Sequence, residues 1–432
     1  MGRHMGRTAP GHNGPMDPQT VEQLASPEGR ELLASLPDYD EGAVLGLTST
    51  LRAQGVSPEL TAALLTQSRL RHRARGKLGA LAGRLLLTAD GLEQATRPQV
   101  AALHAARLAH SGVDRVLDLG CGIGSDALAF ADAGLAVEAV DGDPVTAAVA
   151  AANLSGVPRA HVSVGLAETA LDGRPADEIA RTAAWFDPAR RTPGIADIRG
   201  RTKRVFRLQD MSPTWEVVQQ VAAAVPAAGA KLSPSFPHQA VPPGAEAQWV
   251  SVDGEVVECV VWWGAAVRRP GRCATVLRGD QAWTVAEEDA AVGAAAPPTE
   301  VSDGVYLREG VYLHEADKAV VRAGLVAALE RAVDGTEVEP GVGYVLTAGE
   351  GAVPWARRYR VLEVLDADPK ALRRWARRRD VGALTIKKRG VPGDSEALRR
   401  KLIGKTGVER ILVLTRHHGR QIALEVEACA SD

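Results

Sequence analysis

The sequence predicts an α/β protein built on a Rossmann-like parallel sheet, with a helical region before the sheet and a smaller α/β domain after it. Three observations support this prediction. A strand pattern runs directly into a glycine-rich turn over 116–124. Strand and helix patterns alternate from about 112 to 264. The last part of the chain, from about 359, follows the order β-α-β-α-β-β.

The chain of 432 residues is long enough for about two or three domains. We expect a disordered or non-native segment first, then a helical N-terminal domain and the parallel-sheet domain. A strand and a linker rich in Ala, Pro and Gly should follow, and a small α/β domain should end the chain. The corresponding boundaries are 1–16, 17–110, 111–265, 266–305 and 306–432.

Helical periodicity dominates the N-terminal domain, where apolar residues recur at helix spacing in 60–65 and 78–87. Ser57 followed by Pro58 is a favourable helix start. The segment before the first strand of the sheet is expected either to form a capping turn or to line the ligand pocket. Its pocket-lining candidates are Gln94, Thr96 and Arg97.

The parallel-sheet domain should contain five strands and then a hairpin. The Asp253-Gly254 dipeptide is typical of a tight hairpin turn between two apolar runs. The predicted parallel strands are 115–119, 136–140, 161–164, 183–186 and 229–232.

The first strand carries an acid, Asp118, where a buried parallel strand is normally apolar. A ligand at the carboxyl end of the strand would explain it, because the carboxylate could bind a cationic group. Gly120, Gly122 and Gly124 would let the backbone approach that ligand closely. Cys121 lies in the same turn, where a small side chain is needed more than a reactive one.

The second strand ends in Asp141-Gly142-Asp143, about 20 residues after the glycine turn, a spacing suited to binding ribose hydroxyls. A nicotinamide dinucleotide and S-adenosylmethionine both fit such a turn. Asp118 favours the second, because an acid beside the turn repels a pyrophosphate but tolerates an ammonium and a sulfonium. A strand-turn-helix unit without any ligand is the remaining alternative.

Composition excludes several classes of protein. The formal net charge is −2, and the four cysteines are scattered without a C-x-x-C pair, so neither a disulfide framework nor a metal site is expected. No apolar run is long enough to span a membrane, and no signal peptide is expected. The expected compartment is therefore the cytoplasm.

Cations are dense in the last domain. Lys387, Lys388 and Arg389 lie at a strand end beside a glycine, which is a plausible phosphate-binding edge. A solvated surface that reflects biased composition is the alternative. The other cations of this part of the chain are Arg357, Arg358, Arg360, Arg373, Arg374, Arg377, Arg378, Arg379, Arg399, Arg400, Lys401 and Lys405.

The runs VLDLGCGIG, VDGDP and FDPARR, together with the Arg-rich C-terminal unit, resemble the bacterial class I S-adenosylmethionine-dependent methyltransferases with a C-terminal THUMP-like domain. The resemblance implies a class I methyltransferase sheet, S-adenosylmethionine as cofactor, and RNA binding by the last domain. It implies cofactor contacts from these residues: Asp118, Gly120, Cys121, Gly122, Gly124, Asp141, Gly142, Asp143 and, as an adenine contact, Glu168.

After the fourth strand, Asp187-Pro188 resembles the start of the Asp/Asn-Pro-Pro-aromatic motif of methyltransferases that act on the amines of nucleobases. In that motif the Asp or Asn and a backbone carbonyl accept hydrogen bonds from the target amine, and the ring stacks on the base. Here Ala189 and Arg190 replace the second proline and the aromatic. Trp185, Phe186 or Trp215 could supply the ring instead, and Arg190 and Arg191 could bind an anionic group of the substrate.

The sequence therefore predicts a methyltransferase acting on a base in tRNA or rRNA, with catalysis near Asp187-Pro188 and no metal. A small-molecule methyltransferase with a structural C-terminal domain is one alternative, and a non-catalytic RNA-binding protein is another. Additional candidates lie in loops at strand ends, where ligands bind in this architecture. They are Asp210, Lys231, Ser233 and His238.

Overall fold

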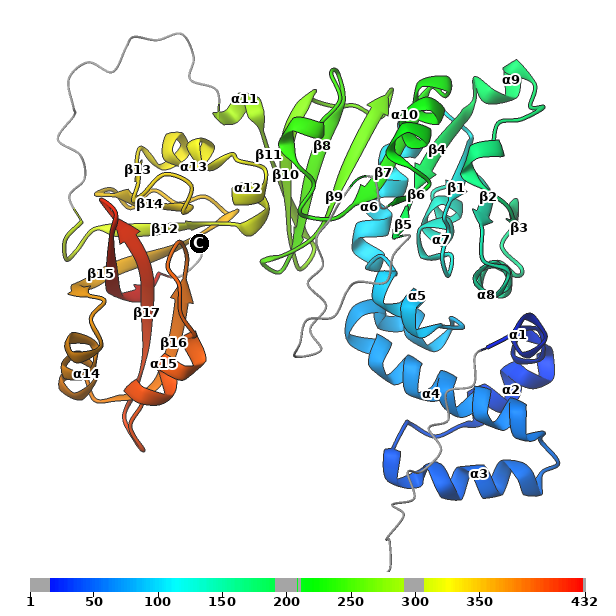
Figure 1. The fold of residues 1–432 in the computed structure, drawn as a ribbon, viewed down its shortest axis with the longest axis horizontal. Coiled ribbons are helices and arrows are strands. Elements are labelled where there is room, and N and C mark those ends of the chain that lie inside the picture. The colour runs from blue at the N-terminus through cyan, green and yellow to red at the C-terminus, as the bar shows by residue number, and fades with distance from the viewer. Residues whose placement is uncertain (1–15, 191–207, 209–210, 291–306, 430–432) are drawn as a thin grey trace, which may run out of the picture. The chain divides into compact units, whose positions relative to one another are not determined.

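The computed structural model describes residues 16–190, 208, 211–290 and 307–429. The chain divides into two compact units, each of which combines separate stretches of sequence. The first unit consists of Met1–Lys231 and Trp262–Val267, and the second of Leu232–Val261 and Arg268–Asp432. Figure 1 labels most of the elements of both units.

Helices form the start of the first unit, as the periodicity predicts. Ser57 caps the longest of them by accepting a hydrogen bond from the Leu60 N–H at 3.1 Å, and Pro58 occupies its first turn. A core of leucines, with Leu24, Leu64 and Leu86 fully buried, holds the helices before Pro98 together. The helices are α1 (Pro18–Ala25), α2 (Pro27–Ser35), α3 (Val44–Ala53), α4 (Pro58–Leu78), α5 (Ala89–Gln94) and α6 (Pro98–Ala109).

The parallel strands of the first unit have the order β7-β4-β1-β2-β3. Each neighbouring pair among them is parallel. The chain proceeds outward from β1 in both directions, so the order reverses between β1 and β4, and ligands bind at such a switch point in open α/β sheets. The elements are β1 (Arg115–Leu119), α7 (Ser125–Asp132), β2 (Ala136–Asp141), α8 (Pro144–Leu154), β3 (Ala160–Val164), α9 (Ala176–Ile179), β4 (Thr182–Phe186), α10 (Trp215–Ala224) and β7 (Ala227–Leu232).

The predicted hairpin is confirmed. Strand β8 (Glu246–Val252) and strand β9 (Glu255–Gly264) are joined by Asp253 at φ 51° and Gly254 at φ 85°, two positive values that a type I′ turn requires. Across the described residues, the complete sheet has nine strands in the order β11-β10-β8-β9-β7-β4-β1-β2-β3. The predicted α/β class with a Rossmann-like sheet is therefore confirmed.

Beyond the hairpin, the described part of the predicted strand-and-linker segment contains two strands. Strand β10 (Gly271–Arg278) pairs in parallel with β8, and β11 (Gln281–Ala286) pairs antiparallel with β10. Both belong to the nine-stranded sheet. A short helix, α11 (Glu287–Ala290), follows.

The C-terminal domain, which we define as 307–429, is a second sheet covered by helices. Within the described residues this sheet has seven strands in the order β13-β14-β12-β15-β18-β17-β16. Alternating residues of β17 and β18 face two separate apolar clusters, one on each side of the sheet. The strands are β12 (Tyr312–Ala316), β13 (Thr336–Glu337), β14 (Tyr344–Thr347), β15 (Ala356–Asp366), β16 (Val381–Lys388), β17 (Val408–His417) and β18 (Arg420–Ala428).

The amphipathic pattern of 316–332 predicts one continuous helix in this domain, and this prediction is wrong. The first residue of this segment ends β12, and the remainder forms two short helices, α12 (Lys318–Arg322) and α13 (Val326–Val333). Gly324 separates them with φ 71°, a conformation that cannot continue a right-handed helix. The two helices of the predicted β-α-β-α-β-β order are present as α14 (Pro369–Arg378) and α15 (Ser395–Leu402).

Short 3-10 turns occur at Glu41–Ala43, Gly79–Gly83, Ala167–Thr169 and His238–Ala240. In the part of the chain that the structure describes, the helices are all too short or too polar to cross a membrane.

Candidate active site

Asp118 is buried near the carboxyl end of β1, with 1% of its surface exposed. Within the described part of the chain, neither of its carboxylate oxygens has a hydrogen-bond partner. Burial, and then the nearby charges of Asp126 and Asp187, raise the pKa of this carboxyl well above its usual value. Burying an unpaired carboxylate costs free energy, and a cationic group of a ligand beside it would lower that cost.

The glycine turn has the open backbone that close approach of a ligand requires. Gly120, Gly122 and Gly124 have φ values of 88°, 56° and 84°. A Cβ at Gly122 would meet nothing within 4 Å, so the space beside it is clear of protein atoms. A Cβ at Gly120 would instead lie 2.8 Å from the carbonyl oxygen of Asp187, which shows how closely the turns after β1 and β4 approach each other.

We expect Gly120→Ala to lower the free energy of unfolding by roughly 2 kcal/mol or more, because it adds backbone strain and a contact with Asp187. Gly122→Ala is the matched control. It has the same left-handed backbone but no contact, so its loss should be smaller, about 1 kcal/mol. Urea unfolding of both variants measures the difference. Equal losses would contradict the close approach of the two turns.

Asp141 ties the end of β2 to the glycine turn. Its Oδ2 accepts a hydrogen bond from the Gly122 N–H at 3.0 Å, and its Oδ1 accepts one from the Asp143 N–H at 2.9 Å. The side chain is half-buried, and burial raises its pKa. Asp143 is exposed and caps α8 by accepting from the Thr146 N–H at 2.7 Å. Asp143 therefore has a structural role that the sequence prediction did not assign to it.

The surface beside Asp141 is apolar. Val164 and Leu166 are 57% and 60% exposed, although both are large hydrophobic residues. A Cβ at Gly142 would lie 3.7 Å from Leu166, so this residue borders the exposed backbone after β2. Glu168 is exposed in the 3-10 turn that follows.

Lys231, at the end of β7, joins several of the predicted residues. Its ammonium forms an ion pair with Asp187 and donates hydrogen bonds to the Thr96 hydroxyl at 3.0 Å and the Gln94 carbonyl at 3.2 Å. A carboxylate oxygen of Asp126 lies 3.9 Å away. The structure thus gathers Gln94, Thr96, Asp187 and Lys231 in one cluster.

Asp126 and His104 complete this cluster, and sequence reasoning missed both. Asp126 lies in the first turn of α7, accepts a hydrogen bond from Thr96 at 2.6 Å and contacts the His104 Nδ1 at 2.9 Å. Although burial alone would raise it, the contact with His104 and the charge of Lys231 hold the pKa of Asp126 below its usual value. No spacing in the sequence links His104 to Asp126, so only their contact reveals the pair.

We expect Lys231→Met to lower the free energy of unfolding by about 3 kcal/mol at neutral pH, because it removes the cation between two carboxylates. The pKa of Asp126 is lower in the folded protein than in the unfolded chain. Ionised Asp126 therefore stabilises the folded state at pH values above its unfolded pKa, and this stability is lost as the pH falls. The deficit of the variant should therefore stay constant from pH 7 down to about pH 4 and shrink only as the pH falls below about 4. Lys231→Arg is the control that keeps the charge. A deficit independent of pH would contradict this explanation.

Two of the three aromatic candidates near Asp187, Trp185 and Phe186, are not available as stacking faces. Trp185 and Phe186 are 0% exposed, and the Trp185 ring packs 4.4 Å from the His104 ring and 5.5 Å from the Trp262 ring. Their predicted role as substitutes for the missing aromatic is therefore wrong, because both belong to the core. Trp215 is half-buried, with its ring 5.7 Å from that of Trp263.

The remaining predicted residues are less informative. Pro188 is half-buried, and Arg190 lies in a short strand, β5 (Ala189–Arg190), paired with β6 (Met211–Ser212). Arg191 and Asp210 lie outside the described residues. Burial raises the pKa of the Cys121 thiol, so it is not a nucleophilic thiolate. In the second unit, Ser233 accepts from the Ser235 N–H, and His238 contacts the Arg322 carbonyl at 2.7 Å.

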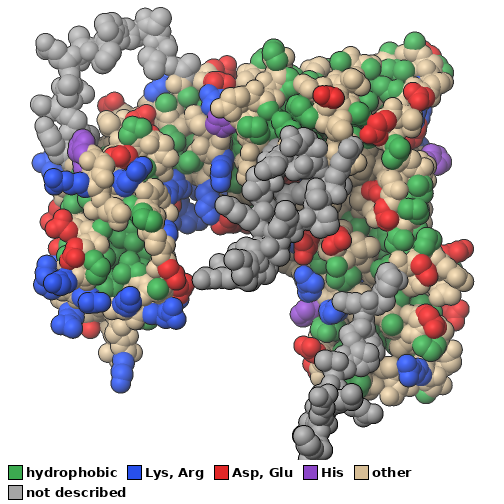
Figure 2. Space-filling view, in the orientation of Figure 1, with side chains coloured by type: hydrophobic (Ala, Val, Ile, Leu, Met, Phe, Trp, Pro, Cys, Tyr) green, Lys and Arg blue, Asp and Glu red, His purple; other side chains and the backbone are tan. Residues whose placement is uncertain are grey.

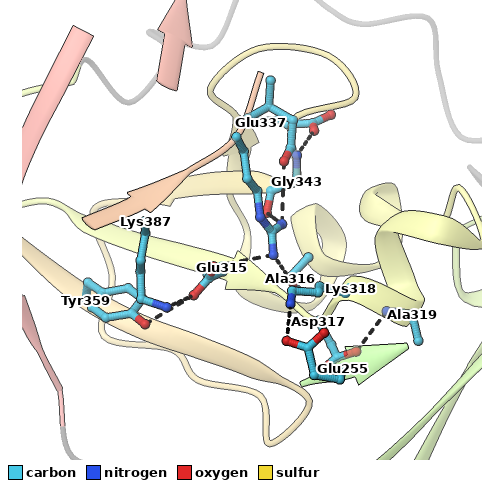
Figure 3. A network of polar contacts seen from close by, with 12 residues as sticks. Glu255, Glu315, Ala316, Asp317, Lys318, Ala319, Glu337, Gly343, Tyr359 and Lys387 are labelled. Atoms are coloured by element: carbon cyan, nitrogen blue, oxygen red, sulfur yellow. Dashed lines mark hydrogen bonds and ion pairs between the residues drawn. The ribbon is translucent and has the colours of Figure 1, made fainter. Parts of the chain in front are cut away.

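The predicted phosphate-binding edge of the C-terminal domain lies within a network of internal contacts. Lys387 donates to Glu315 at 2.7 Å and Tyr359 donates to the same carboxylate at 3.2 Å, as Figure 3 shows. Arg389 donates to the Ala316 carbonyl at 2.9 Å. Lys388 is exposed and bonds the Gly393 carbonyl. Phosphate binding by Lys387 or Arg389 would have to compete with these contacts.

A parallel sheet with a glycine turn and a buried acid at its switch point defines a class, the Rossmann-like proteins that bind a nucleotide-type cofactor. Comparison with known proteins narrows it. Residues 356–428 match the family described as THUMP domain-like, and residues 17–74 match a domain of unknown function.

An S-adenosylmethionine-dependent methyltransferase of Mycobacterium tuberculosis, itself described as uncharacterized, is 30% identical over 372 residues. The match covers 82% of this chain and 92% of that protein. The crystal structure of a Porphyromonas gingivalis protein that is named as a putative methyltransferase superimposes with a TM-score of 0.69 at 18% identity. It covers 91% of this chain and 100% of that one, and shows the same fold.

The chain belongs to the S-adenosylmethionine-dependent methyltransferases, and its C-terminal domain is THUMP-like. It is therefore an enzyme that uses S-adenosylmethionine, as the sequence predicts. This membership removes the non-catalytic alternative.

Proposed function

We propose that the enzyme methylates a base in RNA, with methyl transfer beside Asp187 and RNA bound by the THUMP-like domain. The observation that carries this proposal is the position of Asp187-Pro188 at the end of β4, against the glycine turn. The Asp187 carbonyl oxygen lies 2.8 Å from the position of a Cβ on Gly120, and the Asp187 carboxylate pairs with Lys231.

The residues around the glycine turn fit the proposed cofactor. The buried, unpartnered carboxylate of Asp118 suits the ammonium end of S-adenosylmethionine, and the clear space beside Gly122 suits close approach by the ligand. Gly120 and Gly124 would shape the turn. The half-buried carboxylate of Asp141 keeps lone pairs that could accept from ribose hydroxyls.

The apolar surface after β2 and β3 suits the adenine ring. Leu166 and Val164 would cover a face of the ring, beside the exposed backbone of Gly142. Glu168 would lie at the edge of this region, where a carboxylate could accept from the adenine amine. Cys121 would add only a small apolar contact, because its thiol is protonated.

When bound, S-adenosylmethionine supplies an activated methyl group on its sulfonium sulfur. Asp187 would accept hydrogen bonds from the acceptor amine through its side chain and its backbone carbonyl. This orients the nitrogen lone pair for attack, and positioning of this kind can supply much of the rate. Lys231 is a positioning residue, since its ammonium pairs with the Asp187 carboxylate and is itself held by hydrogen bonds to Thr96 and Gln94.

RNA as substrate is supported by the match of 356–428 to the THUMP domain-like family. The expected substrate is tRNA or rRNA. A small-molecule methyltransferase is the second candidate. It is favoured by the complete burial of Trp185 and Phe186, which removes two of the three aromatic residues that could have replaced the missing ring.

One experiment separates the two candidates. Purified enzyme and methyl-labelled S-adenosylmethionine are incubated with total RNA and, separately, with a small-metabolite extract, both from cells that lack the protein. We expect label in RNA, and nucleoside digestion would identify the base. Label only in the metabolite pool would replace the RNA proposal with the small-molecule one.

A further inference from the structure

Helix α14 presents two arginines on one exposed face. Arg373 and Arg377 are separated by four residues and therefore lie on the same side of the helix. The opposite face is fixed in the core through Leu372, Trp375 and Ala376, all of them buried. Trp375 also donates from its indole nitrogen to Glu425 at 2.9 Å, so this helix cannot rotate freely.

Lys401 approaches the same region from the last turn of α15. Backbone hydrogen bonds join the start of β16 to the loop that follows α15. The Gly404 N–H donates to the Val381 carbonyl, and the Val408 N–H donates to the Asp380 carbonyl, both at 2.7 Å. These contacts fix a floor between the two helix ends and the start of β16.

Together these elements form a groove with a volume of about 390 Å³, within the range of ligand-binding sites. We call it the basic groove. Its walls carry three cations and one carboxylate, and its floor is mainly apolar. The lining residues are Arg373, Ala376, Arg377, Asp380, Val381, Lys401, Leu402, Ile403 and Gly404.

The cations of the basic groove differ from others nearby in lacking partners. Arg378 pairs with Glu363, and Arg399 pairs with Glu396 at 2.9 Å. By contrast, the side chains of Arg373, Arg377 and Lys401 form no hydrogen bond or ion pair with any residue that the structure describes. Figure 2 shows Lys and Arg side chains gathered where Figure 1 labels α14 and α15.

We propose that the basic groove of the C-terminal domain binds the phosphate backbone of the RNA substrate. The proposal rests on the proposed function, which it deepens by naming the surface that holds the RNA. Three cations without an ion-pair partner among the described residues, around one depression, suit successive phosphate oxygens. The apolar floor, with Ile403 39% exposed, offers a surface for a sugar or a base.

The carboxylate of Asp380, in the same groove, is also compatible with RNA as the ligand. It would repel a phosphate directly in contact with it, but it can accept a hydrogen bond from a ribose 2′-hydroxyl, a group that RNA has and DNA lacks. We therefore expect the groove to prefer RNA to DNA of the same sequence.

The alternative phosphate-binding edge lies at the other end of β16. Val381, at the groove, pairs with Val408, and Lys388 pairs with Leu414 near the β17–β18 hairpin. Arg416 and Arg420, both exposed, lie at that hairpin. The two ends of β16 thus each carry three exposed cations that can be neutralised without touching the core.

The test compares two triple variants of the full chain, Arg373→Gln/Arg377→Gln/Lys401→Gln for the groove and Lys388→Gln/Arg416→Gln/Arg420→Gln for the edge. The probe is a fluorescent single-stranded RNA of about 20 nucleotides, with DNA of the same sequence beside it. Affinity is measured over a range of salt concentrations. Both variants lose the same charge, and thermal unfolding checks that both are folded.

We expect the groove variant to reduce the slope of log affinity against log salt by about 2, since each phosphate contact on a single strand contributes about 0.7. The edge variant should keep the wild-type slope. An unchanged slope for the groove variant, or an equal loss in both, would overturn the proposal while methyl transfer to RNA could still succeed. If the wild type neither binds the probe nor transfers methyl to RNA, the proposed function fails as well.

Discussion

Asp187→Ala should lower the rate of methyl transfer at least about 100-fold, because it removes a side-chain acceptor placed against the reacting group. Affinity for S-adenosylmethionine should stay within roughly threefold of wild type, since the proposed cofactor contacts come from other residues. Single-turnover transfer and calorimetric binding measure the two quantities separately.

Asp187→Asn distinguishes this role from a structural one. Asparagine keeps an acceptor oxygen but loses the charge that pairs with Lys231. A residue that serves as acceptor should therefore retain transfer within about tenfold of wild type as Asn, and lose it as Ala. If both variants lose activity equally, the ion pair matters more than the acceptor. Asp132→Ala, at an exposed position of α7, controls for loss of an unrelated acid.

Asp118→Asn should weaken S-adenosylmethionine binding about 10- to 100-fold, because it replaces a charged acceptor for the ammonium by a neutral one. The same change should alter how the ligand-free protein responds to pH. Burial raises the pKa of Asp118 in the folded state, so its proton is held more tightly there than in the unfolded chain. Wild-type stability should then fall as the pH rises above about 4, by up to ~1.4 kcal/mol per pH unit from this group.

The Asn variant should lack this part of the pH dependence, and bound cofactor should suppress it in the wild type. Urea unfolding with and without S-adenosylmethionine at several pH values measures both effects. Asp132→Asn serves as the matched control, since its carboxyl is exposed. An Asp118→Asn protein with undiminished affinity would remove Asp118 from the cofactor site.

The parallel strands could be predicted because each is a short apolar run bounded by turn residues. The Asp253-Gly254 hairpin was equally clear, since few other dipeptides tolerate two positive φ values. Strands β12 to β14 could not be found in this way. β13 has only two residues, and Ala316 begins a stretch whose helical periodicity continues to 332, across the glycine that breaks it.

The site was less predictable than the fold. Asp118 and the glycines carry a local signal, because an acid in a buried strand and three clustered glycines are unusual. The cluster around Lys231 carries none, since Thr96, Asp126 and Asp187 come together only through the order of the strands. The burial of Trp185 could not be predicted either, because a tryptophan beside a loop is equally compatible with core packing and with ligand contact.

The division of the chain into interleaved stretches has a consequence for its biosynthesis. The ring centroids of Trp262 and Trp185 lie 5.5 Å apart, and the Arg107 guanidinium lies over the Trp262 ring, 4.6 Å from its centroid. The Arg107 side chain also donates to the Ala266 carbonyl at 2.7 Å. The ribosome adds residues in order, so Trp185 emerges well before Trp262. The apolar surface around Trp185 therefore lacks the contact with Trp262 while 232–261 is translated. A nascent chain halted at Lys231 would expose that surface, which makes it a substrate for chaperones.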